Sequence, residues 1–149
     1  MFRTLWNGWP TAARFQQVGA CVLGCSSTAE DRIEHYAFCP HFIRLTSGWL
    51  GLHNRLANLE GFMLVANDMS DKEIALMAVA VYAMHRATAF YRQQPTPSRE
   101  QTQDFLQSAC QSAVSGHRSC LRFLEEATRL RHIGTIRCNR DRSRSPRRR

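Results

Sequence analysis

The sequence predicts a mainly α-helical protein in which a small knuckle containing cysteine and histidine precedes a helical bundle or helical hairpin, and a disordered basic C-terminal tail follows. Three observations predict this class. Three cysteines and one histidine fall within residues 21–39, two long helix-forming stretches each begin with a capping motif, and the last residues are mostly arginine and serine. We therefore expect an N-terminal arm and knuckle over residues 1–46, a helical region over 47–134 and the tail over 135–149.

The first part of the arm, residues 1–17, contains aromatic residues between turn formers, and we expect a short helix or an extended segment there. It has no continuous apolar segment and no plausible cleavage site, so no secretory signal is expected. This predicts an intracellular chain with reduced cysteines. The absence of acidic residues before Glu30 gives the arm a faint likeness to a transit peptide, an alternative that Trp6 and Trp9 disfavour because they fit such a helix poorly.

The cysteines and the histidine of the knuckle form two pairs. Three residues separate Cys21 from Cys25, and Gly24 lies just before the second cysteine, where a knuckle often needs a positive φ. His35 and Cys39 are four residues apart, so on a helix both side chains share one face. Structural zinc sites take four thiolate or imidazole ligands at tetrahedral angles. The spacing therefore predicts one structural Zn²⁺ bound by all four residues.

Other readings of the knuckle stay open. Cysteine is often buried without a metal, and His35 can be an ordinary, partly buried histidine. His41 is the main rival for the fourth ligand position. Thr28 and Asp31 are spaced to cap the helix that carries the second pair. Four protein ligands leave no open coordination position for a substrate, so catalytic zinc is disfavoured and no enzymatic activity is expected.

After the knuckle we expect two short helices, at about 41–47 and 52–66, and then a long one. The long helix begins with the capping box Ser70-x-x-Glu73, in which each side chain satisfies a free backbone amide of the first turn. Good helix formers continue to about Gln93, and the prolines that follow end the helix.

The apolar stretch of this long helix, residues 74–84, is the longest in the chain. Its eleven residues suit a buried helix and are too few to cross a bilayer, so no membrane association is expected. Because the stretch is apolar all round, it is expected either to lie in the core or to face a protein partner.

A second capping box, Ser98-x-x-Gln101, begins another helix that we expect to reach about His132 and to pair with the first as an antiparallel hairpin. Cys110 and Cys120 lie on or near its apolar face, where packing is the expected role. Ten residues of straight helix separate these thiols by about 15 Å, so with His117 they form a second metal site only if Gly116 breaks the helix.

The basic charge of the chain is concentrated in its tail. The formal net charge is +8, of which +6 lies in residues 137–149, with seven arginines and one acid. The remaining residues carry thirteen basic and eleven acidic side chains, which gives no broad electrostatic argument for nucleic acid. The arginine-serine tail resembles nuclear-import signals, which favours a nuclear location, and clustered guanidinium groups attract phosphates. A solvated tail without function is the alternative.

The segment from about Thr4 to Pro40 resembles the zinc-binding domain that follows the reverse transcriptase of non-LTR retrotransposons. The likeness rests on an aromatic arm with an Arg-Phe step, a Cys-x3-Cys pair, an acidic loop and a His-x3-Cys pair followed by proline. In this sequence these are Arg14-Phe15, Cys21, Cys25, Glu30-Asp31, His35 and Cys39-Pro40. The resemblance implies that Cys21, Cys25, His35 and Cys39 bind zinc, and that the module works near template RNA or target DNA.

The chain departs from that family in lacking any Tyr-x-Asp-Asp-like polymerase motif, and 149 residues cannot contain a polymerase. It therefore looks like a terminal fragment or a co-opted remnant of a retroelement protein. We expect a non-catalytic zinc-binding module associated with RNA or DNA. The alternative is a protein-interaction adaptor that binds its partner through the helical hairpin, with a purely structural zinc and no nucleic-acid role.

Overall fold

The protein is mainly α-helical, as the sequence predicts. The computed structural model describes Trp9, residues 11–53, Leu56, residues 58–115, residues 121–126 and Arg129. The described elements, in chain order, are η1 (Ala13–Phe15), α2 (Ile33–Phe38), α3 (Pro40–Ile43), η2 (Arg44–Trp49), α4 (Leu59–Phe62), α5 (Asp71–Tyr91) and α6 (Arg99–Val114). Residues 121–126 are helical as well. Within these ranges the only β pairing is an isolated antiparallel bridge between Ala20 and Glu30.

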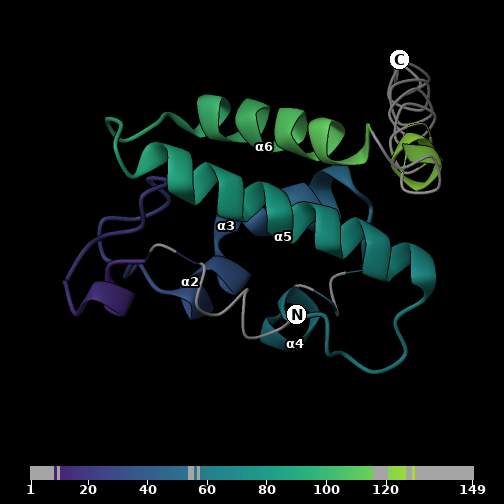
Figure 1. Ribbon diagram of the computed structural model, residues 1–149, viewed down its shortest axis with the longest axis horizontal. Coiled ribbons are helices and arrows are strands. Elements are labelled where there is room, and N and C mark those ends of the chain that lie inside the picture. The colour runs from purple at the N-terminus through teal and green to yellow at the C-terminus, as the bar shows by residue number, and fades with distance from the viewer. Residues whose placement is uncertain are drawn as a thin grey trace, which may run out of the picture.

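Helices α5 and α6 lie side by side and run antiparallel, which confirms the predicted hairpin (Figure 1). Both predicted capping boxes are present: Ser70 and Ser98 accept hydrogen bonds from the backbone N–H groups of Glu73 and Gln101, whose side chains bond back to the caps. α5 ends within two residues of the expected position. α6 ends at Val114, far short of the expected end. Residues 116–120 and 130–132 lie outside the described part of the chain.

Of the two predicted short helices, the one expected at about 41–47 is present as α3 and the π-helical η2, which follow one another without a break. The hydroxyl of Thr46 donates to the carbonyl of Phe42 within it. In the described part of the stretch 52–66, the α-helix is α4, which contains one turn. Asn58 has an extended backbone and caps α4 through the N–H of Gly61, and Leu64 adopts a positive φ of 58° just after the helix. Both residues interrupt what looked like one continuous stretch.

One hydrophobic cluster contains residues of the knuckle and of the helices. α5 contributes the largest share to it, including Met77, Ala80 and Met84. The buried Trp9 of the arm reaches the same cluster, with its ring 5.4 Å from that of Phe62 and 5.3 Å from that of His85. The histidine that ends the apolar stretch therefore packs at the edge of the core. The predicted boundaries near 46 and 134 remain predictions.

α5 is the one described helix that is long and apolar enough, by length and composition alone, to cross a membrane. Half of that stretch is buried inside the protein, and a core helix meets the same criteria, so this is weak evidence for a membrane span. The expected disordered tail, residues 135–149, lies outside the described residues.

Candidate metal centre

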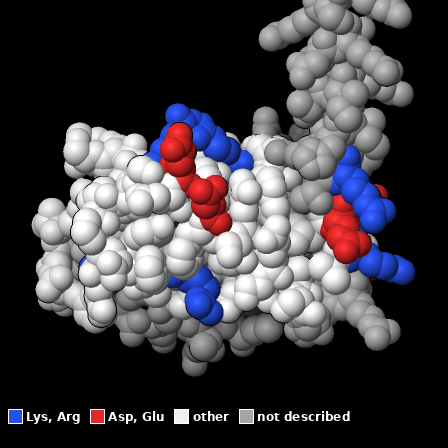
Figure 2. All heavy atoms as spheres, turned by 90° about the horizontal axis from the view of Figure 1, so that it is seen from above, with Lys and Arg blue, Asp and Glu red and all other residues white. Residues whose placement is uncertain are grey.

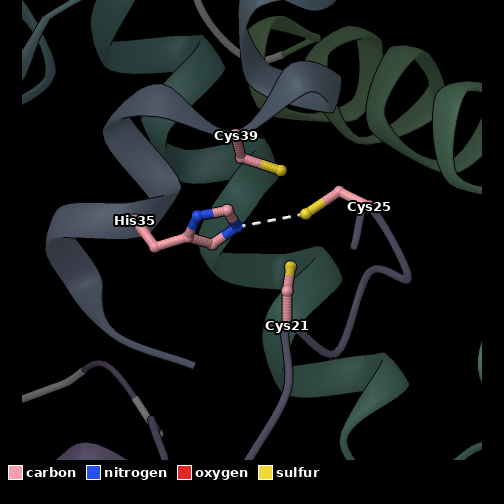
Figure 3. A group of neighbouring side chains, drawn as sticks. All are labelled: Cys21, Cys25, His35 and Cys39. Atoms are coloured by element: carbon pink, nitrogen blue, oxygen red, sulfur yellow. Dashed lines mark hydrogen bonds between the residues drawn. The ribbon is translucent and has the colours of Figure 1, made fainter. Parts of the chain in front are cut away.

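The structure brings the four predicted ligands together from two parts of the chain (Figure 3). Cys21 and Cys25 lie on a tight loop, in which the N–H of Gly24 donates to the carbonyl of Cys21 at 3.0 Å. The N–H of Cys21 in turn donates to the carbonyl of Ala29 at 2.8 Å, which places the loop beside the returning chain. His35 lies on α2 and Cys39 follows directly after it. The side chains of both pairs therefore point into one space.

The geometry of this cluster, which we call the Cys₃His cluster (Cys21, Cys25, His35 and Cys39), fits one metal ion. Its four donor atoms lie within 4.8 Å of one another, and His35 Nε2 lies 3.2 Å from Cys25 Sγ. With Zn–S near 2.3 Å and Zn–N near 2.0 Å, tetrahedral zinc needs donors about 3.5–4 Å apart. The widest pair must therefore close by about 1 Å, and His35 Nε2 and Cys25 Sγ must separate slightly. Three sulfur donors and one imidazole are typical of a closed structural zinc site.

Hydrogen bonds and burial shift the pKa values of the three thiols in opposite directions. A hydrogen bond from Cys39 lowers the pKa of Cys21 to about 4, and the same bond raises the pKa of Cys39. Burial and the neighbouring negative charge of Cys21 raise the pKa of Cys25 to about 11. Without a cation, the cluster therefore favours one thiolate and two protonated thiols. A bound Zn²⁺ supplies the positive charge that allows all three to ionise.

The loop of the first pair packs against the connection between α5 and α6. Gly24 has a φ of 66°, as the knuckle spacing predicts. A Cβ atom at this position would lie 2.7 Å from Thr96 Cγ2 and 3.3 Å from the carbonyl oxygen of Pro97. Only glycine meets both conditions without strain. The short distances also show that the loop of Cys21 and Cys25 is in direct contact with the helical hairpin.

Asp31 has a role that the sequence did not predict. The expected cap of α2 by Thr28 and Asp31 is wrong, because Arg32 occupies the cap position and makes no side-chain cap bond. The buried carboxylate of Asp31 instead accepts hydrogen bonds from the N–H of Ala12 at 2.7 Å, the hydroxyl of Tyr36 at 2.5 Å and Arg92 Nη2 at 2.6 Å. It thereby joins the arm, the helix that carries His35, and the end of α5.

His41, the rival fourth ligand, lies outside the cluster. Its ring nitrogen Nδ1 is 3.3 Å from Nε2 of Gln103 on α6, which also donates to the His41 carbonyl at 3.2 Å. Burial lowers the pKa of His41, which favours the neutral ring. Cys110 is fully buried between α5 and α6, and its thiol lies 3.9 Å from the carbonyl of Val79, as expected for a packing role. Cys120 and Cys138 lie outside the described residues.

The aromatic side chains of the knuckle differ in exposure. Tyr36 is fully buried, so it belongs to the core and is unavailable for stacking on a ligand. Phe15 and Phe38 are 56% and 54% exposed. Trp9, Asp31 and Arg92 are the structural residues of this region that sequence reasoning missed. No local spacing pattern marks them, because their partners are far away in the chain.

Comparisons of the chain with known protein families, with curated proteins and with solved structures found no match.

Proposed function

We propose that the protein is a non-catalytic zinc-binding module that associates with RNA or DNA and derives from the zinc-binding domain of a retroelement reverse transcriptase. The Cys₃His cluster carries the proposal, since its four donor atoms come within 4.8 Å of one another. Four protein donors complete a tetrahedral coordination sphere, and this supports a structural ion and no enzymatic role.

The nucleic-acid part of the proposal rests on charge and on exposed rings. Residues 137–149 carry most of the net charge, and an arginine cluster attracts phosphates and releases counterions. Such a tail also favours a nuclear location. Phe15 and Phe38 are exposed on the knuckle, and exposed aromatic rings can stack on bases. Figure 2 shows one face on which Lys and Arg mostly lie beside Asp and Glu, separated by uncharged surface, so a broad basic surface is absent from the described part of this face.

A second candidate function is that of a protein-interaction adaptor. A hollow of about 170 Å³ lies on the outer side of the α5–α6 hairpin, and its lining includes Tyr82, Arg86 and Phe105. Nearby, Phe90 is half exposed and stacks on Phe105 with ring centroids 5.0 Å apart. A partner helix or loop with apolar side chains matches such a surface. In this case the zinc serves only to stabilise the fold.

Zinc analysis and binding assays test the proposal. We expect about one zinc per chain in purified protein, and Cys21→Ser or Cys39→Ser should remove it. Fluorescence anisotropy with mixed-sequence RNA and DNA at two salt concentrations should show binding by the full chain. Deletion of residues 137–149 should weaken this binding strongly and flatten its salt dependence, because fewer counterions are released. Protein that contains zinc but binds no nucleic acid even at low salt would favour the adaptor.

A further inference from the structure

A cavity lies beside the Cys₃His cluster, where the knuckle meets α3 and the start of α6. Its volume is about 250 Å³, and six residues line it: Gly24, Cys25, Pro40, His41, Arg44 and Arg99. Pockets for drug-sized molecules usually exceed about 300 Å³, so this cavity suits a small group and not a large ligand. None of the six lining residues is acidic.

Two arginines from different elements face this cavity. Arg44 begins η2 and Arg99 begins α6, and both are exposed. Within the described part of the chain neither forms an ion pair, whereas Arg32, Arg92 and Lys72 each pair with a carboxylate. Two positive charges that share a cavity repel each other, and an anion between them would relieve this repulsion.

The acids at the start of α6, Glu100 and Asp104, do not line the cavity. Gln103 bonds to His41, which shows that the side of α6 carrying Arg99 and Gln103 faces α3. Glu100 and Asp104 each follow one of these residues by a single position. They are therefore rotated about 100° around the helix from the cavity-facing side. The first acids of α6 therefore lie on a different side of the helix from Arg99.

We propose that Arg44 and Arg99 form a binding site for one backbone phosphate of a nucleic acid, next to the zinc ligands. Guanidinium groups bind phosphate oxygens through paired N–H donors, and such contacts position a nucleic acid without reading its sequence. The inference rests on the proposed function and adds a specific contact on the folded body to the diffuse attraction of the tail. This contact would hold the nucleic-acid strand at the knuckle.

A full-length Arg44→Gln/Arg99→Gln protein tests the site. The matched control is Arg122→Gln/Arg129→Gln, which removes the same charge from two exposed arginines outside the cavity. Affinity for single-stranded RNA and DNA of two unrelated sequences would be measured across a salt series. We expect the cavity variant to bind about tenfold more weakly on every sequence, with a salt slope lower by about 0.7 for the lost phosphate. The control should lose less than about twofold, since it removes only long-range attraction.

Zinc content and thermal unfolding of both variants distinguish loss of the metal or of the fold from loss of the phosphate contact. A loaded Cys₃His centre carries a formal charge of −1, so the arginines can also serve to offset that charge. A cavity variant that loses zinc but binds RNA like its control would overturn the phosphate site. Equal loss in both double variants would overturn it as well, while the proposed function would stand. If the unaltered protein binds no nucleic acid at low salt, both proposals fail.

Discussion

Gly24 meets two separate requirements at one position. Its φ of 66° belongs to the left-handed region that side chains with a Cβ avoid at a cost of about 1–2 kcal/mol. It also lies against Thr96, so the loop that carries Cys21 and Cys25 is held by its contact with the α5–α6 connection. The first requirement is visible from the spacing before Cys25, whereas the second depends on a contact across the fold.

Gly24→Ala should therefore destabilise the protein by roughly 2–4 kcal/mol, through backbone strain and overpacking together. Gly51→Ala is the matched control, since Gly51 has a φ of 68° but no atom within 4 Å of an added Cβ. It should cost only about 1–2 kcal/mol. Denaturant unfolding of both zinc-loaded proteins measures the difference. Adding Thr96→Ala to Gly24→Ala should recover part of the loss, and equal costs at the two glycines would contradict the contact.

Asp31 stabilises the region by gathering three donors around a buried carboxylate. Its side chain is 1% exposed, while that of its ion-pair partner Arg92 is 26% exposed. Breaking a buried pair from one side costs about 3–5 kcal/mol, because the remaining charge is left without a partner. Arg92 keeps some access to water, which places the expected cost near the lower end of that range.

We predict that Asp31→Asn and Arg92→Gln each lower the free energy of unfolding by about 3 kcal/mol, and that the double variant costs much less than their sum. The exposed pair of Arg32 with Glu30 offers the control. Arg32→Gln should cost less than about 1 kcal/mol, because both side chains are more than half exposed. Additive effects of Asp31→Asn and Arg92→Gln would show that the two groups do not act as a pair.

At the scale of elements, helix caps explain which parts of the fold could be predicted. Ser70 and Ser98 are local signals, and each places a helix start at the correct residue. Neither α3 nor α4 begins with a capping box. The conformation of Asn58 and the positive φ of Leu64 depend on packing around α4, so a pattern of apolar residues could not locate that helix. The four residues of the Cys₃His cluster could be grouped from the sequence because their spacing is local, whereas Asp31 pairs with Arg92 across 61 positions.

The cap of α6 predicts how a substitution at Ser98 changes the free energy of unfolding. Ser98→Ala should cost about 1 kcal/mol, because the N–H of Gln101 loses its acceptor at 3.2 Å. Ser112→Ala, on an exposed position inside the same helix, should instead be neutral or slightly stabilising, because alanine is the better helix former. Thermal and denaturant unfolding compare the two. A cost at Ser112 equal to that at Ser98 would argue against the capping box.

At the scale of the whole molecule, the Cys₃His cluster and the helical hairpin share a core. Cys21 and Cys39 are buried in the same hydrophobic cluster as Met77 and Leu106, so two members of the Cys₃His cluster are part of the packing. The arm enters this cluster through Trp9. Two of the direct links to the hairpin lie at one end of it, where Gly24 meets Thr96 and Asp31 meets Arg92.

Removal of zinc should therefore lower protection from hydrogen exchange most in the knuckle, less in the α5–α6 connection and least in the middle of α5. Structural zinc contributes about 10–16 kcal/mol of apparent binding free energy that is coupled to local folding. Hydrogen exchange with and without a chelator should show the largest loss of protection over residues 18–40. A smaller loss is expected over 92–98, which contacts the knuckle, whereas the middle of α5 should keep its protection through α6. Asp31→Asn with zinc bound is the control, since it should loosen 92–98 while leaving the Cys₃His cluster loaded. Unchanged exchange over residues 18–40 after complete removal of the metal would contradict a structural zinc at this site.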